Sequence, residues 1–510
     1  MNAILDYVDF RQQQFLRMLS RSMNSIILGR YAQLVLFQTT DNLPHLFVYC
    51  TSLRHLHVIS ITRRRDVAAL CSVIQAGALH MLITLDLQYC RFTDSNIRLL
   101  CNALCSGNCS RLQILRLSNN AVGVAGSTAL ATCLARGALP SIRYLDMQHN
   151  LLFSEGVKRI GGSFIHFRCR NVQSLDFSRC HLANPGMAAL CASLDQCPLI
   201  NLRYLRLYWN SFTAGAMKHL AMSVSLGVLD NLEVLDVVGN RIGWKGVAVL
   251  AESILRGDHL RGLRVLILHS CALGPIAMRW VGVLFRRLRE LRVLSLGNNR
   301  IKADGVRFLF EGFRFDSFFY PNLRVLDLTN NQIGEKGVWY LVSMIRNNNC
   351  PRLEELSLIS NDLRDNGLLK LLYVVKFGFL PHLRILYLSD NKLQDTSVLA
   401  LIALLRQCKI APSAELHIGC NALSNTVVQE LVSLLYLPHS GGEPVLKYVI
   451  LEKKKKSIPK QLLRRALLPR YQMEEAVEEF CWECLWNKQG SSSWRGEKRN
   501  RRSPRSRAEA

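Results

Sequence analysis

Residues 324–338 read RVLDLTNNQIGEKGV, and this stretch decides the fold because its pattern recurs along the chain. Leucines alternate with other residues, an asparagine pair follows, and then come an isoleucine and a glycine. Alternation with a period of two is typical of a β-strand. A buried asparagine is tolerated only when its amide is hydrogen-bonded. The place of Asn331 beside buried leucines therefore needs either a structural or a functional explanation.

The same frame recurs every 28 to 32 residues. Counting from Leu323, Asn331 is eight positions on, and ten further frames start at Leu82, Leu112, Ile142, Val172, Leu202, Leu232, Leu263, Leu291, Leu353 and Leu383, with a weaker copy at Ser413. The residue that comes eight after the first residue of each frame is an asparagine or a cysteine, and these ladder residues are Cys90, Asn120, Asn150, Cys180, Asn210, Asn240, Cys271, Asn299, Asn331, Asn361, Asn391 and Asn421.

We interpret these twelve residues as a structural ladder and not as a catalytic or binding set. An amide side chain both donates and accepts hydrogen bonds, so an asparagine in each repeat can bond the backbone of its neighbours. A thiol is small, tolerates burial and donates weakly, which lets cysteine take the same place.

The second half of each unit has helical spacing. Val247, Leu250, Ala251 and Ile254 lie at i, i+3, i+4 and i+7. Each unit is therefore a strand, a turn and a helix, and stacking of units makes the core continuous. Seven repeats have a glycine six positions after the ladder residue, where we expect either a positive φ or close packing: Gly126, Gly156, Gly186, Gly246, Gly305, Gly337 and Gly367.

Units of about 30 residues, with asparagine and cysteine sharing one position and a full helix in each unit, resemble the ribonuclease-inhibitor-type leucine-rich repeats. The resemblance covers residues 50–440 and implies an α/β solenoid, a horseshoe with parallel strands on the concave face and helices on the convex face. Proteins with such repeats include ribonuclease inhibitors, the leucine-rich repeat ends of NOD-like receptors and Ran GTPase-activating proteins. Most of them bind proteins, so the resemblance implies a protein partner.

The chain divides into four parts. We expect an N-terminal cap over 1–49, a solenoid of about 12 to 13 repeats over 50–440, a C-terminal cap with a strand and a helix over 441–486, and a disordered basic tail over 487–510. Within the caps, short strands are expected at 33–37 and from Leu446 onward.

The cysteines favour an intracellular protein. There are 17, an odd number, and several occupy ladder or helical positions, which indicates reduced and buried thiols. The first residues lack the pattern of a secretory signal, and no apolar run reaches the length of a membrane span. We expect a cytoplasmic or nuclear protein; four arginines among the first 30 residues keep a mitochondrial presequence as an alternative.

The sequence gives no sign of an enzyme. It contains no phosphate-binding loop, no HExxH or GxSxG motif and no paired metal ligands. We therefore expect no catalytic residues, no metal and no cofactor.

A candidate partner-binding patch lies on the predicted concave face. Counting the first residue of each frame as one, positions 3, 5 and 7 point into the horseshoe and position 8 lies at its edge. Position 5 is often aspartate, so we expect a partly acidic inner stripe. Exposed aromatic residues next to charged ones are typical of binding hot spots. The predicted patch consists of Tyr144, His149, Asp176, Tyr204, Arg206, Tyr208, Trp209 and Asp236.

Three functions fit these observations. The first is an intracellular scaffold or adaptor that binds a protein on its concave face. The second is a GTPase activator resembling the Ran type. The third is a ribonucleoprotein or nucleic-acid-associated factor that uses the basic tail, because the formal net charge is +26 and residues 445–510 hold 17 lysines and arginines against 8 glutamates. Such a tail suits RNA, an anionic surface or nuclear import, and it also fits a purely solubilising segment.

Overall fold

The computed structural model describes residues 33–37, 52–59, 61, 64–165, 169–310, 322–347, 350–407, 410, 414–437 and 444–451. The chain divides into two compact units, residues 1–462 and 463–510, and all described residues lie in the first. Most of the N-terminal cap, the predicted helix within 441–486 and the tail over 487–510 lie outside the described residues.

In the described part of the chain, the strands form one parallel sheet of 15 strands whose spatial order equals the sequence order. The strands are β1 (Gln33–Phe37), β2 (His55–Ile59), β3 (Thr84–Asp86), β4 (Ile114–Arg116), β5 (Tyr144–Asp146), β6 (Ser174–Asp176), β7 (Tyr204–Arg206), β8 (Val234–Asp236), β9 (Val265–Ile267), β10 (Val293–Ser295), β11 (Val325–Asp327), β12 (Glu355–Ser357), β13 (Ile385–Tyr387), β14 (Ala414–His417) and β15 (Leu446–Ile450).

A helix lies between most pairs of successive strands. The described helices are α4 (Arg64–Gln75), α5 (Asp94–Leu104), α6 (Val124–Ala135), α7 (Phe153–Phe164), α8 (Ala183–Gln196), α9 (Ala214–Ser225), α10 (Gly243–Gly257), α11 (Gly274–Arg287), α12 (Lys302–Phe310), α13 (Gly334–Arg346), α14 (Arg364–Lys376), α15 (Asp395–Arg406) and α16 (Asn425–Ser433).

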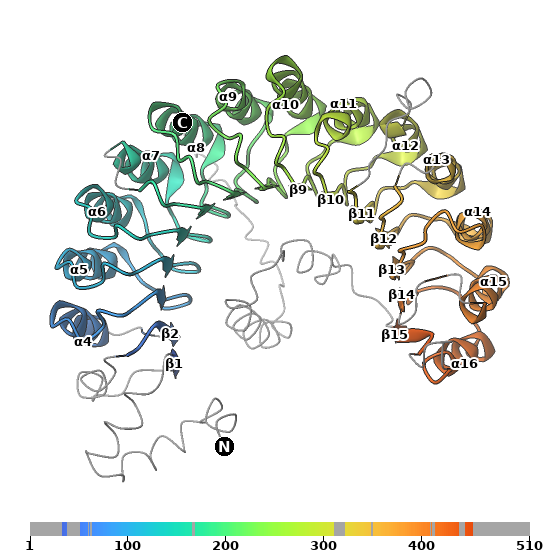
Figure 1. The fold of residues 1–510 in the computed structure, drawn as a ribbon, viewed down its shortest axis with the longest axis horizontal. Helices are drawn as coiled ribbons and strands as arrows, with labels where there is room; N and C mark the ends of the chain where they lie inside the picture. The colour runs from blue at the N-terminus through green and yellow to red at the C-terminus, as the bar shows by residue number, and fades with distance from the viewer. Residues whose placement is uncertain are drawn as a thin grey trace, which may run out of the picture. The chain divides into compact units, whose positions relative to one another are not determined.

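Within this unit the strands line the inner side of an open curve and the helices line its outer side (Figure 1). The strands pair in register, so that residues at the same frame position lie side by side, as in Asp176 with Arg206 and Arg206 with Asp236. The short strands expected at 33–37 and from Leu446 are both present as β1 and β15. The predicted α/β solenoid with parallel strands on the inner face is therefore confirmed.

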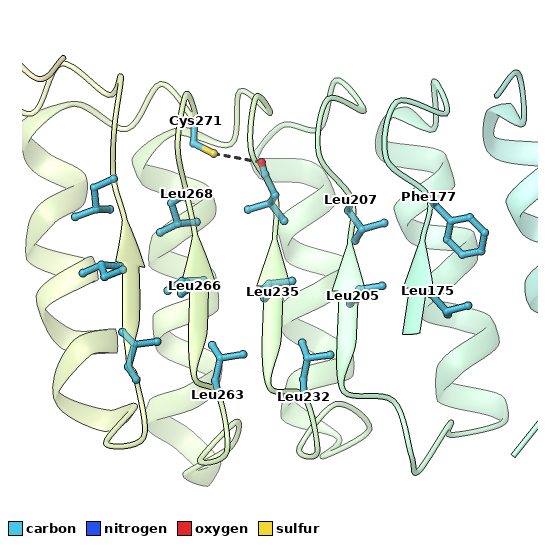
Figure 2. Close-up of a cluster of buried hydrophobic side chains, with 14 of the residues drawn as sticks. Leu175, Phe177, Leu205, Leu207, Leu232, Leu235, Leu263, Leu266, Leu268 and Cys271 are labelled. Atoms are coloured by element: carbon cyan, nitrogen blue, oxygen red, sulfur yellow. Dashed lines mark hydrogen bonds between the residues drawn. The ribbon is translucent and has the colours of Figure 1, made fainter. Parts of the chain in front are cut away.

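The core is a continuous stack of leucines between the sheet and the helices (Figure 2). The middle residue of each three-residue strand is a leucine, and these side chains are buried: Leu85, Leu115, Leu145, Leu175, Leu205, Leu235, Leu266, Leu294, Leu326, Leu356 and Leu386. Each packs against its equivalent on the next strand, so no single repeat has a closed core of its own.

Close packing, and not backbone conformation, explains the recurrent glycine near the start of seven helices. None of the seven glycines has a positive φ. A Cβ on Gly337 would lie 2.2 Å from Ile333 Cγ2, and one on Gly305 would lie 2.4 Å from Ile301 Cγ2. The missing side chain therefore lets the first turn of the helix approach the residue four positions earlier.

Candidate functional site: the inner face at strands β5 to β8

The ladder residues hold neighbouring repeats together. The Asn331 amide donates from Nδ2 to the carbonyls of Leu296, at 3.0 Å, and Leu328, at 3.0 Å. Its Oδ1 accepts from the backbone N–H groups of Asn299, at 2.9 Å, and Ile301, at 3.3 Å. One side chain thus satisfies backbone groups of two successive repeats, which is a structural use of Asn331.

The same arrangement extends along the ladder. Each of the nine asparagines donates to a carbonyl of the preceding repeat: Asn120, Asn150, Asn210, Asn240, Asn299, Asn331, Asn361, Asn391 and Asn421. The thiols of Cys90, Cys180 and Cys271 donate to the equivalent carbonyls, and the bond from Cys271 to Val237 measures 3.3 Å (Figure 2). The side chains of the ladder residues are therefore hydrogen-bonded within the scaffold.

The residue before each ladder residue has a left-handed backbone. The φ angle is 55° at His149, 54° at Arg179, 53° at Trp209 and 69° at Gly239. This conformation ends the strand and turns the chain toward the helix. Because it recurs at the same position, His149, Arg179, Trp209 and Gly239 form one row along the edge of the inner face.

Trp209 is the most distinctive side chain in that row. It is 53% exposed, yet its ring is held on both sides. On one side lies Gly239, where an added Cβ would meet Trp209 Cδ2 at 2.6 Å. On the other side the Arg179 guanidinium carbon lies 5.7 Å from the ring centroid, a cation–π distance. The sandwich presents a large aromatic surface to solvent in a fixed orientation.

The remaining aromatic residues of the predicted patch are less accessible than we expected. Tyr204 is only 8% exposed, while Tyr144 and Tyr208 are half-buried. The Tyr144 hydroxyl lies 3.4 Å from Gln173 Oε1, and the Tyr208 backbone N–H donates to Ser178 Oγ. Parallel strands lie about 4.8 Å apart, so side chains at equivalent positions cover one another. The prediction of exposed aromatics is thus wrong for Tyr204 and holds in full for Trp209.

The predicted acidic stripe is largely buried. Asp176 and Asp236 are 6% and 5% exposed. Their Oδ1 atoms accept from the backbone N–H two residues on, at Ser178 and Val238, both at 3.0 Å. The carboxylates therefore close the ends of the strands, in the manner of an Asx-turn. Sequence position alone placed them on the inner face, but their oxygen atoms are used by the backbone.

Burial also shifts three carboxyl groups of this stripe toward their neutral forms. It raises the pKa of Asp236 to about 6, against the weaker effects of the Val238 N–H group and Arg206. Burial likewise raises the pKa of Asp146 and of Asp176; Asp176 adds to the effect at Asp146, while Arg206 opposes it at Asp176. The pKa of the Tyr208 hydroxyl is raised above its usual range, chiefly by burial.

Positive and aromatic groups dominate the accessible edge of the site. Arg179, His149 and Trp209 are exposed, and the His149 ring Nδ1 lies 2.7 Å from Asn119 Oδ1. Burial and the nearby Arg179 lower the pKa of His149, which favours its neutral form. Arg179 and Gly239 were not in the predicted patch, although they occupy the same frame position as Trp209 in the adjacent repeats.

No group of three or more histidine, cysteine, aspartate or glutamate side chains suited to a metal ion occurs among the described residues. Across that same part of the chain, the helices are too short or too polar to cross a membrane. The site thus combines an exposed aromatic and basic edge with the carboxylates of Asp146, Asp176 and Asp236, and Arg206 lies between the last two.

Comparison with known proteins identifies the class of this chain. A family model described as leucine-rich repeat matches residues 168–191, 229–251, 321–341 and 379–401, and each match covers a strand and the start of the following helix. The chain is similar to ribonuclease inhibitor from Sus scrofa, with 29% identity over 224 residues that cover 44% of this chain and 47% of that protein.

A second relative is NACHT, LRR and PYD domains-containing protein 3 from Homo sapiens, with 27% identity over 270 residues, 48% of this chain and 25% of that protein. Among solved structures, an internalin from Listeria monocytogenes covers 80% of this chain and 86% of that chain, with 14% identity and a TM-score of 0.31. The matches span about half or less of these curated relatives. The chain contains leucine-rich repeats, and they are similar to those of ribonuclease inhibitors.

Proposed function

We propose that this chain is an intracellular, non-enzymatic scaffold that binds a protein partner on its inner face, with Trp209 as the anchor. The observation that supports this most directly is the sandwich of Trp209 between Arg179 and Gly239. Tryptophan and arginine are enriched among residues that dominate binding free energy. An exposed tryptophan held in one orientation has no evident use within the scaffold.

The surroundings of Trp209 favour a protein over a small ligand. Tyr208 and Tyr144 present half-buried rings on the same inner face, and His149 and Arg179 add polar contacts at the edge. A row of this kind offers a broad surface with an aromatic centre and a polar rim, which is the usual anatomy of a protein interface. The relative's name, ribonuclease inhibitor, makes a ribonuclease a sensible first protein to titrate.

Proximity labelling in the source cells, followed by direct titration of the recovered proteins, tests this proposal. We expect Trp209→Ala to weaken binding of a genuine inner-face partner by at least about tenfold, in line with the effect of removing a hot-spot tryptophan. Trp244→Ala is the matched control, because Trp244 is also exposed but lies at the start of α10. If the Trp209→Ala variant recovers the same proteins and binds them with the same affinity as the natural chain, Trp209 is not the anchor.

The two alternative functions make different predictions. A Ran-type GTPase activator would accelerate GTP hydrolysis in a panel of small GTPases, whereas a scaffold would not. A ribonucleoprotein factor would bind RNA with a steep salt dependence that disappears on removal of residues 487–510. Those residues lie outside the described part of the chain.

A further inference from the structure

A second surface of interest lies on the outer side of three consecutive helices, α13, α14 and α15. Trp339, Leu369 and Leu399 are 51%, 40% and 41% exposed, and each stands eight residues after the ladder asparagine of its repeat. Tyr373 and Phe377 follow Leu369 by four and eight residues, on the same face of α14 and at its end. We call these five residues the outer apolar patch.

The patch is a local departure from the rest of the solenoid. In the other repeats from α5 to α16, the position of Trp339 is occupied by polar residues or alanine: Arg98, Thr128, Lys158, Ala188, Lys218, Ala248, Arg279, Arg307 and Gln429. The repeat scaffold therefore does not require an apolar side chain there. Contiguous exposed apolar residues are typical of an interaction surface.

Aromatic contacts fix the middle of the outer apolar patch. The ring centroids of Tyr373 and Phe377 lie 4.5 Å apart. The Arg346 guanidinium carbon lies 5.7 Å from the Tyr373 centroid, and Lys376 Nζ lies 5.9 Å from the Phe377 centroid. The rings are thus held from α13 and from the end of α14, and cations stand directly beside them.

The charge around the outer apolar patch is positive. Lys336, Arg346, Lys370 and Lys376 are exposed, and within the described part of the chain no ion pair is found for any of them. Two of the nearby carboxylates, those of Asp365 and Asp395, bond the scaffold instead. Asp365 Oδ1 accepts from the backbone N–H of Gln394 at 2.8 Å, and Asp395 Oδ1 accepts in the same way from the next repeat, at 2.8 Å.

We propose that the outer apolar patch is a docking surface for an amphipathic helix of a partner protein, one that carries glutamate or aspartate beside leucine or aromatic residues. The four cations favour acidic side chains, and the exposed rings favour apolar ones. Packed helices lie about 8 to 10 Å apart, so Trp339, Leu369 and Leu399 together span about 20 Å. That length corresponds to about 13 residues of helix at 1.5 Å per residue.

A helix suits this surface better than an extended peptide. Extended peptides bind by adding a strand to a sheet edge, whereas amphipathic helices lay an apolar face against apolar side chains. Four residues of the patch lie in helices, and Phe377 directly follows α14. It also lies on the side of the solenoid opposite to the strands, so this interaction is independent of the proposed inner-face partner (Figure 1).

The experiment is a calorimetric titration of the full chain with a synthetic helical peptide of about 16 residues, with leucine and tryptophan on one face and glutamate on the other. We expect saturable binding that weakens by at least about tenfold in the double variant Trp339→Ala/Phe377→Ala. The charge reversal Lys370→Glu/Lys376→Glu and a lysine-for-glutamate peptide should weaken binding by a similar factor, and added salt should do so as well. Each substituted side chain is exposed, so we expect the variants to fold, and circular dichroism checks this.

The control variant is Lys158→Ala/Lys218→Ala, which changes the equivalent position on α7 and α9 and should leave the affinity within about twofold. Absence of saturable binding, unchanged affinity in the double variant, or equal affinity for the glutamate and lysine peptides would overturn the proposal. Two further outcomes would also overturn it by assigning another occupant. One is a concentration-dependent dimer of the full chain that the double variant abolishes. The other is patch-dependent binding to phosphatidylserine vesicles without binding of the peptide.

Discussion

At the scale of single residues, the ladder asparagine shows how one amide replaces the hydrogen bonds that a strand loses at its end. Asn331 is fully buried and bonds two repeats at once. Replacing it with alanine removes the partner of backbone carbonyl groups and of backbone N–H groups inside the solenoid. We expect Asn331→Ala to lower the free energy of unfolding by about 3 kcal/mol, since each buried unsatisfied group costs about 1 to 3 kcal/mol. Urea denaturation measures this change.

Asn331→Cys is the matched control for that prediction. The chain itself uses cysteine at three ladder positions, and the Cys271 thiol still donates to a carbonyl of the preceding repeat. The cysteine variant should therefore lose clearly less stability than the alanine variant. Equal losses would mean that packing, and not hydrogen bonding, sets the role of this position.

Gly239 is the second residue whose role can be isolated. Gly239→Ala places a Cβ against the Trp209 ring, at 2.6 Å from Cδ2, in a backbone with φ of 69°. We expect a loss of about 2 kcal/mol, made of about 1 kcal/mol for the left-handed backbone and a similar amount for the displaced ring. Thermal unfolding measures the total loss of stability, and partner affinity reports the displacement of the Trp209 ring.

Gly274→Ala separates the two contributions. Gly274 has a similar φ of 67°, but an added Cβ would meet nothing within 4 Å. It should therefore lose only the backbone part of the stability and leave the inner-face partner's affinity unchanged. A loss of affinity in both variants would show that the effect does not pass through Trp209.

Among the elements, the first turn of α13 contains the recurrent glycine, Gly337, and the packing leaves no room for a side chain there. Gly337→Ala would bring a Cβ to 2.2 Å from Ile333 Cγ2, and we expect it to destabilise the fold by about 1 to 3 kcal/mol through overpacking. Gly162, inside α7, has nothing within 4 Å of an added Cβ. Gly162→Ala should stabilise by about 0.5 to 1 kcal/mol, because alanine favours a helix more than glycine does. The same chemical change should thus have opposite signs, as urea denaturation would show.

The sheet contributes a pH dependence through its buried carboxylates. The pKa of Asp236 is about 6 in the folded chain, above the 3.8 of an ordinary aspartate. A raised folded pKa favours folding below the unfolded pKa, and this stability is lost as the pH rises from about 4 through about 6. Asp236→Asn keeps the bond to the Val238 N–H and removes the titration.

Denaturation of both chains between pH 4 and pH 7 tests this. We expect the stability of the variant, relative to the natural chain, to increase over that range by about 2 to 3 kcal/mol, since one pKa unit corresponds to about 1.4 kcal/mol. Titrating groups that do not interact with Asp236 cancel in the comparison, and the pKa of Asp176, which the Asp236 charge raises, falls in the variant and changes stability in the same direction. Parallel pH profiles for the two chains would contradict the raised pKa.

The elements also show what the sequence could and could not predict. Strand, turn and helix were predictable because residues equivalent to Leu326 and Asn331 recur at fixed positions in each repeat. The burial of Tyr204 and Asp236 was not, because it depends on neighbouring strands about 4.8 Å apart that cover each other's side chains. Arg179 and Gly239 were missed, although their frame position beside Trp209 was a usable signal. The outer apolar patch had a similar signal, since Trp339 breaks a column of polar residues.

On the scale of the whole molecule, the solenoid behaves as a stack in which each repeat contacts its neighbours. Removing residues 353–382 takes out one complete repeat and joins Arg352 to Leu383. Asn391 would then occupy the place of Asn361 and accept from the Asn331 N–H. We expect a folded chain whose urea m-value falls by about 8%, in proportion to the surface lost.

A deletion of residues 353–367 is the corresponding control. It removes β12 and the first turn of α14, which leaves the rest of that helix without its strand. Leu383 and Asn391 then no longer follow at repeat spacing, so we expect a much larger loss of stability than for the complete repeat. Similar behaviour of the two deletions in circular dichroism melts would contradict a stack of equivalent units.

The sandwich around Trp209 has a thermodynamic consequence for recognition. A side chain that becomes ordered only on binding loses about 0.5 to 1.5 kcal/mol of rotational freedom at that moment. Trp209 has already lost this freedom on folding, because Gly239 and Arg179 hold its ring. A partner that docks there does not have to order this side chain, because the entropy was already lost when the chain folded. The binding entropy of the complex should therefore be less unfavourable than that of a complex formed with a freely rotating tryptophan.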